Sequence, residues 1–286
     1  GAQPTSPLGL SSAQDPPSVP DSVPRAASSE RGFPFPSQLH SPLDRSTQTW
    51  GIAQDRRGLL YVASNHGILQ YDGEQWNRIL TASDTPTRSV AADSLVYVGA
   101  RSDFGYLRPD SVGTLRYHSL LDRVPKEKRG FGDVWSTHTV GGNVYFQSRK
   151  YLFRWDGKEI TTWTSRGEFH TSFVAGQNLY IRDTDQGLLH LEGGKLQKTL
   201  GGEKFSDTPI YMISIGPDGR LVIATQDRGL LVRKGGPFRS LTPDLVPFLS
   251  QNNLYHGTSL PGGRYALATI QTGVVVVNSS GEVVRV

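Results

Sequence analysis

The chain has 286 residues, 36% of them hydrophobic and 20% charged, which is enough to bury a large hydrophobic core. It contains no cysteine, so disulfides and thiolate chemistry are excluded, and no apolar run approaches the roughly 18 residues that predict a membrane-spanning helix. The formal net charge of +4 at pH 7 is spread along the chain and not gathered in a stripe, which argues against a nucleic-acid surface.

The N-terminal segment, residues 1–44, is rich in Pro, Ser, Ala and Asp and has almost no large apolar side chains. Such a segment buries too little apolar surface to offset the entropy of ordering, so we expect it to be disordered. The chain begins with Gly and not with Met, and a Pro/Ser-rich start suits the stretch that follows a removed signal peptide. We therefore expect a periplasmic or other extracytoplasmic location.

Four short strands are predicted directly after this segment. They cover residues 49–54, 59–64, 68–71 and 75–80. Asp72-Gly73, between the third and fourth strands, tolerates the positive φ of a tight hairpin. The chain here predicts a small antiparallel sheet with successive strands as neighbours.

The same unit recurs about every forty residues along the chain. Its third strand begins just after a fixed position, marked by Gly67, Gly105, Lys150, Gly187, Gly229 and Gly273. Strands and turns at this period, without helical segments between them, predict blades around a central axis. We therefore predict an all-β fold, a β-propeller of six visible four-stranded blades in residues 45–286. The blades are expected at roughly 46–80, 87–120, 131–163, 169–200, 209–241 and 252–286.

The two ends of the predicted ring bear on whether the blades close into a complete propeller. The sixth unit ends at residue 286 with its outer strand barely finished, and only residues 33–43 form a weak strand candidate before Thr49. An unclosed ring exposes two strand edges. We expect the natural polypeptide to continue and to supply a seventh blade, with a complete six-bladed ring as the alternative.

The first unit, TWGIAQDRRGLLYVASNHGILQYDGEQW (residues 49–76), resembles the two-component regulator propeller repeat, and residues 219–232 and 264–284 are similar to later copies. Departures occur at Ala92-Asp93-Ser94 and Gly176-Gln177-Asn178, which replace the D-x-x-G turn. The resemblance implies the extracytoplasmic sensing part of a membrane-bound bacterial regulator. In that family, propellers precede a membrane span and a kinase, cyclase, phosphatase or DNA-binding output, which this chain does not contain.

Catalytic patterns are weak. Glycan hydrolysis needs two carboxylates across a cleft, and the candidates in the loops expected between second and third strands are Asp103, Asp183, Asp185 and Asp227. Aspartates in such loops commonly bond their own backbone. The seven histidines show no metal-ligand spacing, and there is no G-x-S-x-G. We expect that this chain is not an enzyme and needs no cofactor or metal. An enzymatic output domain would belong to a missing C-terminal part.

Binding remains as the expected activity, because loops of several blades meet at one rim of a propeller. Arginines in these loops can clamp a carboxylate or sulfate, polar residues can accept from hydroxyls, and aromatic residues near inner-strand starts, Trp135 and Tyr211 among them, can stack on a sugar. The predicted ligand-binding residues are His66, Arg101, Asp103, Arg149, Asp185, Gln226, Arg228, Tyr255 and Gln271.

The sequence thus predicts a non-enzymatic, extracytoplasmic ligand-sensing propeller of a bacterial signal-transduction regulator, tethered to the inner membrane in the full-length protein. The expected ligand is a small molecule or oligosaccharide, either acidic or neutral. A homodimer is an open alternative to a monomer, and we expect this region to contact no nucleic acid. The membrane is reached only through a missing segment. The alternatives are a protein-binding scaffold propeller and a carbohydrate-active enzyme that uses loop carboxylates.

Overall fold

A computed structural model describes residues 48–82 and 84–285; the disorder expected for residues 1–44 lies outside the described residues. These form six four-stranded antiparallel sheets, each built from four successive strands, so the predicted β-propeller with six visible blades is confirmed. The inner strands are β1 (Thr49–Gln54), β5 (Thr87–Ala92), β9 (Ser136–Val140), β13 (Phe169–Ala175), β17 (Ile210–Ile215) and β21 (Leu254–Leu260).

The second strands are β2 (Leu60–Ser64), β6 (Val96–Ala100), β10 (Asn143–Gln147), β14 (Asn178–Asp183), β18 (Leu221–Thr225) and β22 (Arg264–Thr269). The third are β3 (Gly67–Tyr71), β7 (Asp103–Pro109), β11 (Tyr151–Trp155), β15 (Gly187–Glu192), β19 (Gly229–Arg233) and β23 (Gly273–Val277). The outer strands are β4 (Trp76–Ile79), β8 (Leu115–Ser119), β12 (Ile160–Thr164), β16 (Lys195–Lys198), β20 (Arg239–Ser240) and β24 (Val283–Arg285).

Short helices connect some blades. They are the 3-10 turns Leu121–Arg123, Lys126–Lys128, Glu203–Phe205 and Pro243–Leu245, and the α-helix α1 (Val246–Gln251). Within the described ranges, no helix has the length and apolar character needed to cross a bilayer.

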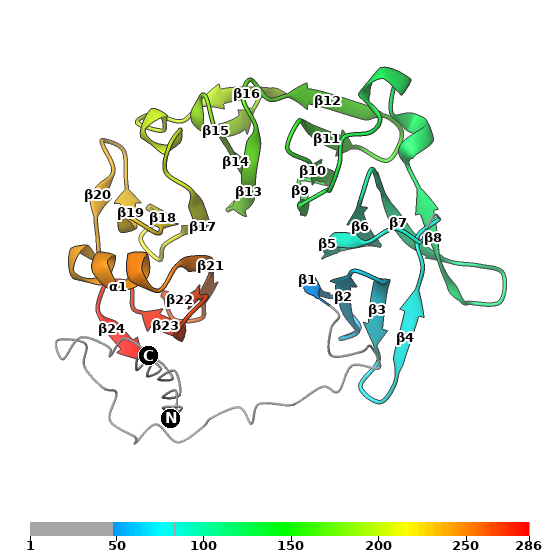
Figure 1. The fold of residues 1–286 in the computed structure, drawn as a ribbon, viewed down its shortest axis with the longest axis horizontal. Coiled ribbons are helices and arrows are strands. Elements are labelled where there is room, and N and C mark those ends of the chain that lie inside the picture. The colour runs from blue at the N-terminus through cyan, green and yellow to red at the C-terminus, as the bar shows by residue number, and fades with distance from the viewer. Residues whose placement is uncertain (1–47, 83, 286) are drawn as a thin grey trace, which may run out of the picture.

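The blades follow one another around a central axis with their inner strands toward it (Figure 1). Each inner strand contacts the next from β1 through to β21, and no comparable contact joins β21 to β1 among the described residues. The two end blades accordingly carry exposed apolar side chains, with Ile52 67% and Val274 48% exposed, whereas every residue of β18 is buried. The seventh blade expected from the sequence stays a prediction.

Aromatic packing joins the second and third blades. Phe104, on β7, is fully buried and stacks on Phe146 with 4.4 Å between ring centroids. Phe153 and Phe131 lie 4.9 and 5.6 Å from the same ring. Because aromatic pairs add to the free energy of area burial, this cluster is a main stabilising contact between blades.

Buried hydroxyls also connect neighbouring blades. The Thr87 hydroxyl on β5 accepts from the backbone N–H of Ser64 at 3.0 Å and lies 2.9 Å from the Gly67 carbonyl of the first blade. The Ser89 hydroxyl donates to the Val134 carbonyl, 2.8 Å away, ahead of the third blade. Such bonds satisfy polar groups that would otherwise be costly to bury, so they fix how the blades sit against each other.

His138, on β9, makes a similar contact with the fourth blade, because its Nε2 lies 3.0 Å from both the carbonyl and the hydroxyl oxygen of Ser172. Burial lowers the pKa of His138 from 6.5 to about 4. The unfolded chain therefore takes up this proton at a higher pH than the folded chain. The stability that depends on neutral His138 is complete above about pH 6.5 and is lost as the pH falls toward 4.

The free energy of unfolding of the wild type should fall between pH 6.5 and 4. We expect this fall to be smaller in His138→Gln, by about 3 kcal/mol at most. Urea unfolding at a series of pH values measures this. His118→Gln is the matched control, because His118 is exposed. An unchanged decline in the His138 variant would show that this residue does not stay neutral in the fold.

The register of the second blade differs from the expected one. Ala100 pairs with Asp103, at the position where Ser64 pairs with Gly67 in the first blade. Asp103 and not Gly105 is therefore the equivalent of Gly67, and Asp103 opens strand β7 instead of lying in a loop. The loop is short because Ser102 adopts a φ of 54°, a conformation that usually marks glycine.

Gly105 is required for another reason. A Cβ at this position would lie 2.0 Å from the carbonyl oxygen of His118 on the neighbouring strand β8. We expect Gly105→Ala to lower the free energy of unfolding by about 1–3 kcal/mol, since the strands must move apart. Gly236→Ala is the control, because its Cβ would meet nothing within 4 Å. Equal urea midpoints for the two variants would contradict the close approach.

Candidate functional site: an aromatic and arginine-lined mouth

Irregular pairing at the start of the inner strands shapes one mouth of the propeller. The pairing with the second strand shifts at the first residues of five inner strands. Such bulges re-aim side chains. The side chains at these shifts are Trp50, Arg88, His170, Tyr211 and Tyr255. The loops between second and third strands lie at the same end of each blade as the starts of the inner strands. This follows because each inner strand runs antiparallel to its second strand.

A compact group, here called the Trp–Arg cluster, is formed by Trp50, Arg88, Trp135, Asn65 and Asp133. The Arg88 guanidinium carbon lies 4.4 Å from the centroid of the Trp50 ring and 5.7 Å from that of Trp135. The two indoles meet edge to face at 5.7 Å. Arg88 is only 8% exposed, so its charge is held in a poorly solvated position between two aromatic rings.

Hydrogen bonds fix this cluster across three blades. The side-chain oxygen of Asn65 accepts from the Trp50 indole N–H at 3.0 Å and from Arg88 Nη1 at 2.6 Å. The Asp133 carboxylate lies 3.4 Å from Arg88 Nε and 3.2 Å from Arg101 Nε. Arg88 Nε is buried without a well-aligned acceptor in the part of the chain that the structure describes. A guanidinium has five N–H donors, so Arg88 and Arg101 keep donors beyond these contacts.

Arg149 adds a third cation from the next blade. Its guanidinium carbon lies 6.0 Å from the Trp135 ring centroid, and its Nη1 is 3.1 Å from the exposed carboxylate of Glu168. Arg88, Arg101 and Arg149 face two carboxylates, Asp133 and Glu168, so the cluster together with these neighbours carries an excess of positive charge. Exposed pairs such as Arg149–Glu168 are weak and exchange readily with a competing anion.

His170 and Tyr211 continue the mouth, with ring centroids 6.4 Å apart. Burial and the nearby Arg182 and Arg149 charges lower the pKa of His170 to about 4, and its Nδ1 is buried with no hydrogen-bond partner among the described residues. Tyr255, 60% exposed, follows on the sixth blade. A neutral imidazole and two phenols thus offer donors and acceptors beside the charged cluster.

The structure places the predicted binding residues unevenly. Arg101 and Arg149 adjoin the Trp–Arg cluster. Tyr255 lies at an inner-strand bulge. The Gln226 amide donates to Asn253, 3.2 Å away and just before the sixth blade. The other loop positions belong to separate blades and are exposed or half-buried: His66, Asp185, Arg228 and Gln271. No contact between described residues brings these four side chains together.

Asp103 differs from the expectation of a loop acceptor. It is 8% exposed and accepts from the Phe104 N–H at 2.8 Å and the Ser119 hydroxyl at 2.6 Å. Burial raises the pKa of its carboxyl. Its observed partners lie on β7 and β8, so it ties these two strands together at the end opposite their connecting turn.

Sequence reasoning missed Trp50, Arg88 and Asp133. The signal for Arg88 was a charged residue within a predicted inner strand. Trp50 occupies the same second position of its strand as Tyr211 and Tyr255. Among the residues that the structure describes, no group of three or more His, Asp or Glu could hold a metal.

The fold is that of the β-propellers. The chain matches virginiamycin B lyase from Staphylococcus aureus at 11% identity with a TM-score of 0.60, over 82% of each chain. YCF48 from Cyanidioschyzon merolae matches at 14% identity and a TM-score of 0.55, over 79% of this chain and 80% of that one. These matches show a shared fold.

A third match has a different context. It is the extracellular domain of BT3049 from B. thetaiotaomicron, a protein assigned to the hybrid two-component systems, at 15% identity and a TM-score of 0.57. It covers 80% of this chain and 33% of that chain. No family model matches the chain, and no curated protein matches it.

Proposed function

We propose that this chain is the non-enzymatic, ligand-sensing propeller of a bacterial signal-transduction protein that works outside the cytoplasm. The observation that carries the proposal is the Trp–Arg cluster, where Arg88 is buried between two indoles at a channel mouth. The repeat's resemblance to regulator propellers supports the signalling context, and the fold shared with the BT3049 extracellular domain is consistent with it.

The ligand we propose is an acidic oligosaccharide. The free donors of Arg88, Arg101 and Arg149 suit a carboxylate or sulfate group, which accepts paired hydrogen bonds from guanidinium. Tyr255 and the indoles provide flat apolar surfaces for a sugar ring. A neutral sugar would leave the excess positive charge uncompensated.

A thermal-shift screen tests this function. We expect uronate-containing or sulfated oligosaccharides to raise the Tm and neutral oligosaccharides of equal length to leave it nearly unchanged. Arg101→Ala should weaken the response, whereas Arg239→Ala, at an exposed position on outer strand β20, should not. Absence of any response to acidic glycans, together with tight capture of a protein, would favour the scaffold alternative.

The enzyme alternative predicts turnover of a glycan and its loss on substitution of Asp103 or Asp185. Asp103 is buried in the second blade, whereas Asp185 is exposed on the fourth. Incubation with the glycans that raise the Tm, followed by product analysis, separates the alternatives: the proposal predicts recovery of intact glycan, and cleavage that depends on either aspartate would overturn it.

A further inference from the structure

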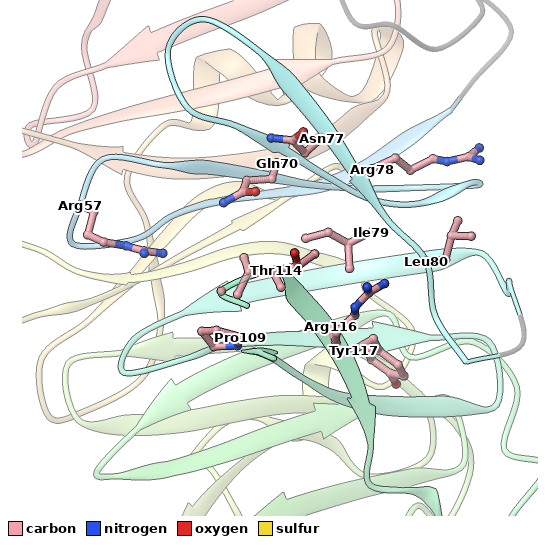
Figure 2. A pocket seen from close by; sticks show the side chains of 12 residues that line it. Arg57, Gln70, Asn77, Arg78, Ile79, Leu80, Pro109, Thr114, Arg116 and Tyr117 are labelled. Atoms are coloured by element: carbon pink, nitrogen blue, oxygen red, sulfur yellow. The ribbon is translucent and has the colours of Figure 1, made fainter. Parts of the chain in front are cut away.

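A groove of about 610 Å³ lies on the outer side of the molecule, between the first and second blades. Four consecutive residues of the first blade, 77–80, line one wall, and five of the second, 113–117, line the other. Side chains of a strand alternate between its faces, so the runs of consecutive residues place the edges of β4 and β8 at the groove. Gln70 of β3, paired with Asn77, adds part of the sheet face to the first-blade wall. Figure 2 shows β4 and β8 on its two sides.

Both edges are free among the described residues. There β4 pairs only with β3, and β8 pairs only with β7, so each is the last strand of its sheet. The β7–β8 hairpin extends outward beyond the rest of its blade (Figure 1). Free strand edges expose unpaired backbone N–H and C=O groups that can bind another strand.

The groove is basic. Of the residues that the structure describes, its lining includes Arg57, Arg78 and Arg116 and no acidic side chain. Arg57 is paired with Asp55. Arg116 donates to Asp110 through its Nε alone, so the two terminal nitrogens of Arg116 have no partner among the described residues. Arg78 makes no ion pair within the described ranges. Figure 2 shows the Arg116 guanidinium directed toward Ile79 and Leu80 on the facing wall.

Apolar and amide groups complete the lining. Leu80 is 43% exposed, and Leu115 and Pro109 lie opposite it. Gln70 and Asn77 supply side-chain amides on the first-blade wall. An extended peptide with alternating acidic and apolar side chains matches this set, since its two faces would meet guanidinium and apolar surface in turn while its backbone pairs with a strand edge.

We propose that the groove between β4 and β8 binds an extended acidic peptide segment of a partner protein, which adds a strand at these edges. This site is separate from the mouth, so it stands or falls independently of the proposed ligand sensing. Charge complementarity and the free backbone edges select a peptide over a polyanion without amide groups.

Fluorescence anisotropy with a labelled peptide of alternating Glu and Val tests the proposal. We expect binding by the Glu-Val peptide and none by its Lys-Val counterpart or by a Glu-Val peptide whose central residues are replaced by Pro, which cannot donate to a strand edge. Arg78→Glu combined with Arg116→Glu should weaken binding at least about tenfold per arginine. Arg239→Glu is the matched control.

Arg78 and Arg116, where the charge is reversed, are both exposed. Equal Tm values for the wild type and the double variant would show that the fold is kept. The proposal is overturned by absence of Glu-Val binding, by equal binding of the Pro-containing peptide or of an acidic oligosaccharide at this groove, or by affinity that the double reversal leaves unchanged. The Tm response to acidic oligosaccharides should persist in the double variant, which separates this site from the mouth.

Discussion

Replacing Phe104 by alanine should lower the free energy of unfolding by about 3–5 kcal/mol. Its ring is fully buried and contacts three other phenylalanines, at centroid distances from 4.4 to 5.6 Å. Its removal leaves a cavity between the second and third blades that rigid strands cannot fill. Chemical denaturation monitored by tryptophan fluorescence measures the loss.

Tyr255→Ala is the control for size, because it removes a ring of similar volume that is 60% exposed. We expect that variant to change the free energy of unfolding by less than about 1 kcal/mol. If the two substitutions cost the same, the aromatic cluster does not hold the two blades together as described.

Replacing Arg88 by methionine should reduce affinity for an acidic oligosaccharide by roughly tenfold to a hundredfold, the effect of losing one charged hydrogen-bonding group. Methionine keeps an unbranched apolar chain between Trp50 and Trp135 but removes the charge and the bond to Asn65. Titration calorimetry on wild type and variant measures the change.

Two further variants make this result interpretable. Arg149→Met, at an exposed position beside Trp135, should weaken binding without affecting the fold. Arg239→Met should bind as the wild type does. Undiminished affinity in both Arg88→Met and Arg149→Met would remove the mouth as the acidic-ligand site.

The six four-stranded blades were predictable because their determinants are local. Alternating strands and Gly-containing hairpins, such as Asp72-Gly73, lie within a few residues of each other, and the repeat shows them six times. Asp55, in the first turn, accepts from the backbone N–H groups of Arg57 and Leu59, as expected of turn aspartates. The predicted register of the second blade was wrong because Ser102 adopts the left-handed conformation that the prediction had assigned to a glycine.

The mouth was less predictable because its contacts join different blades. Asn65 and Arg88 are 23 residues apart in the chain, and both Trp50 and Arg88 depend on bulges for their placement. A one-residue irregularity changes the face on which a side chain lies, and no pattern within a single strand reveals it. Loop positions could be named from sequence, but not which of them meet.

The most direct test of ligand recognition at the mouth is a crystal structure of the protein with the acidic oligosaccharide that most raises its Tm. We expect the ligand beside Trp50, Arg88 and Trp135, with its carboxylate or sulfate bonded to Arg88, Arg101 or Arg149. A ligand bound only elsewhere on the molecule, with the Trp–Arg cluster unoccupied, would contradict it.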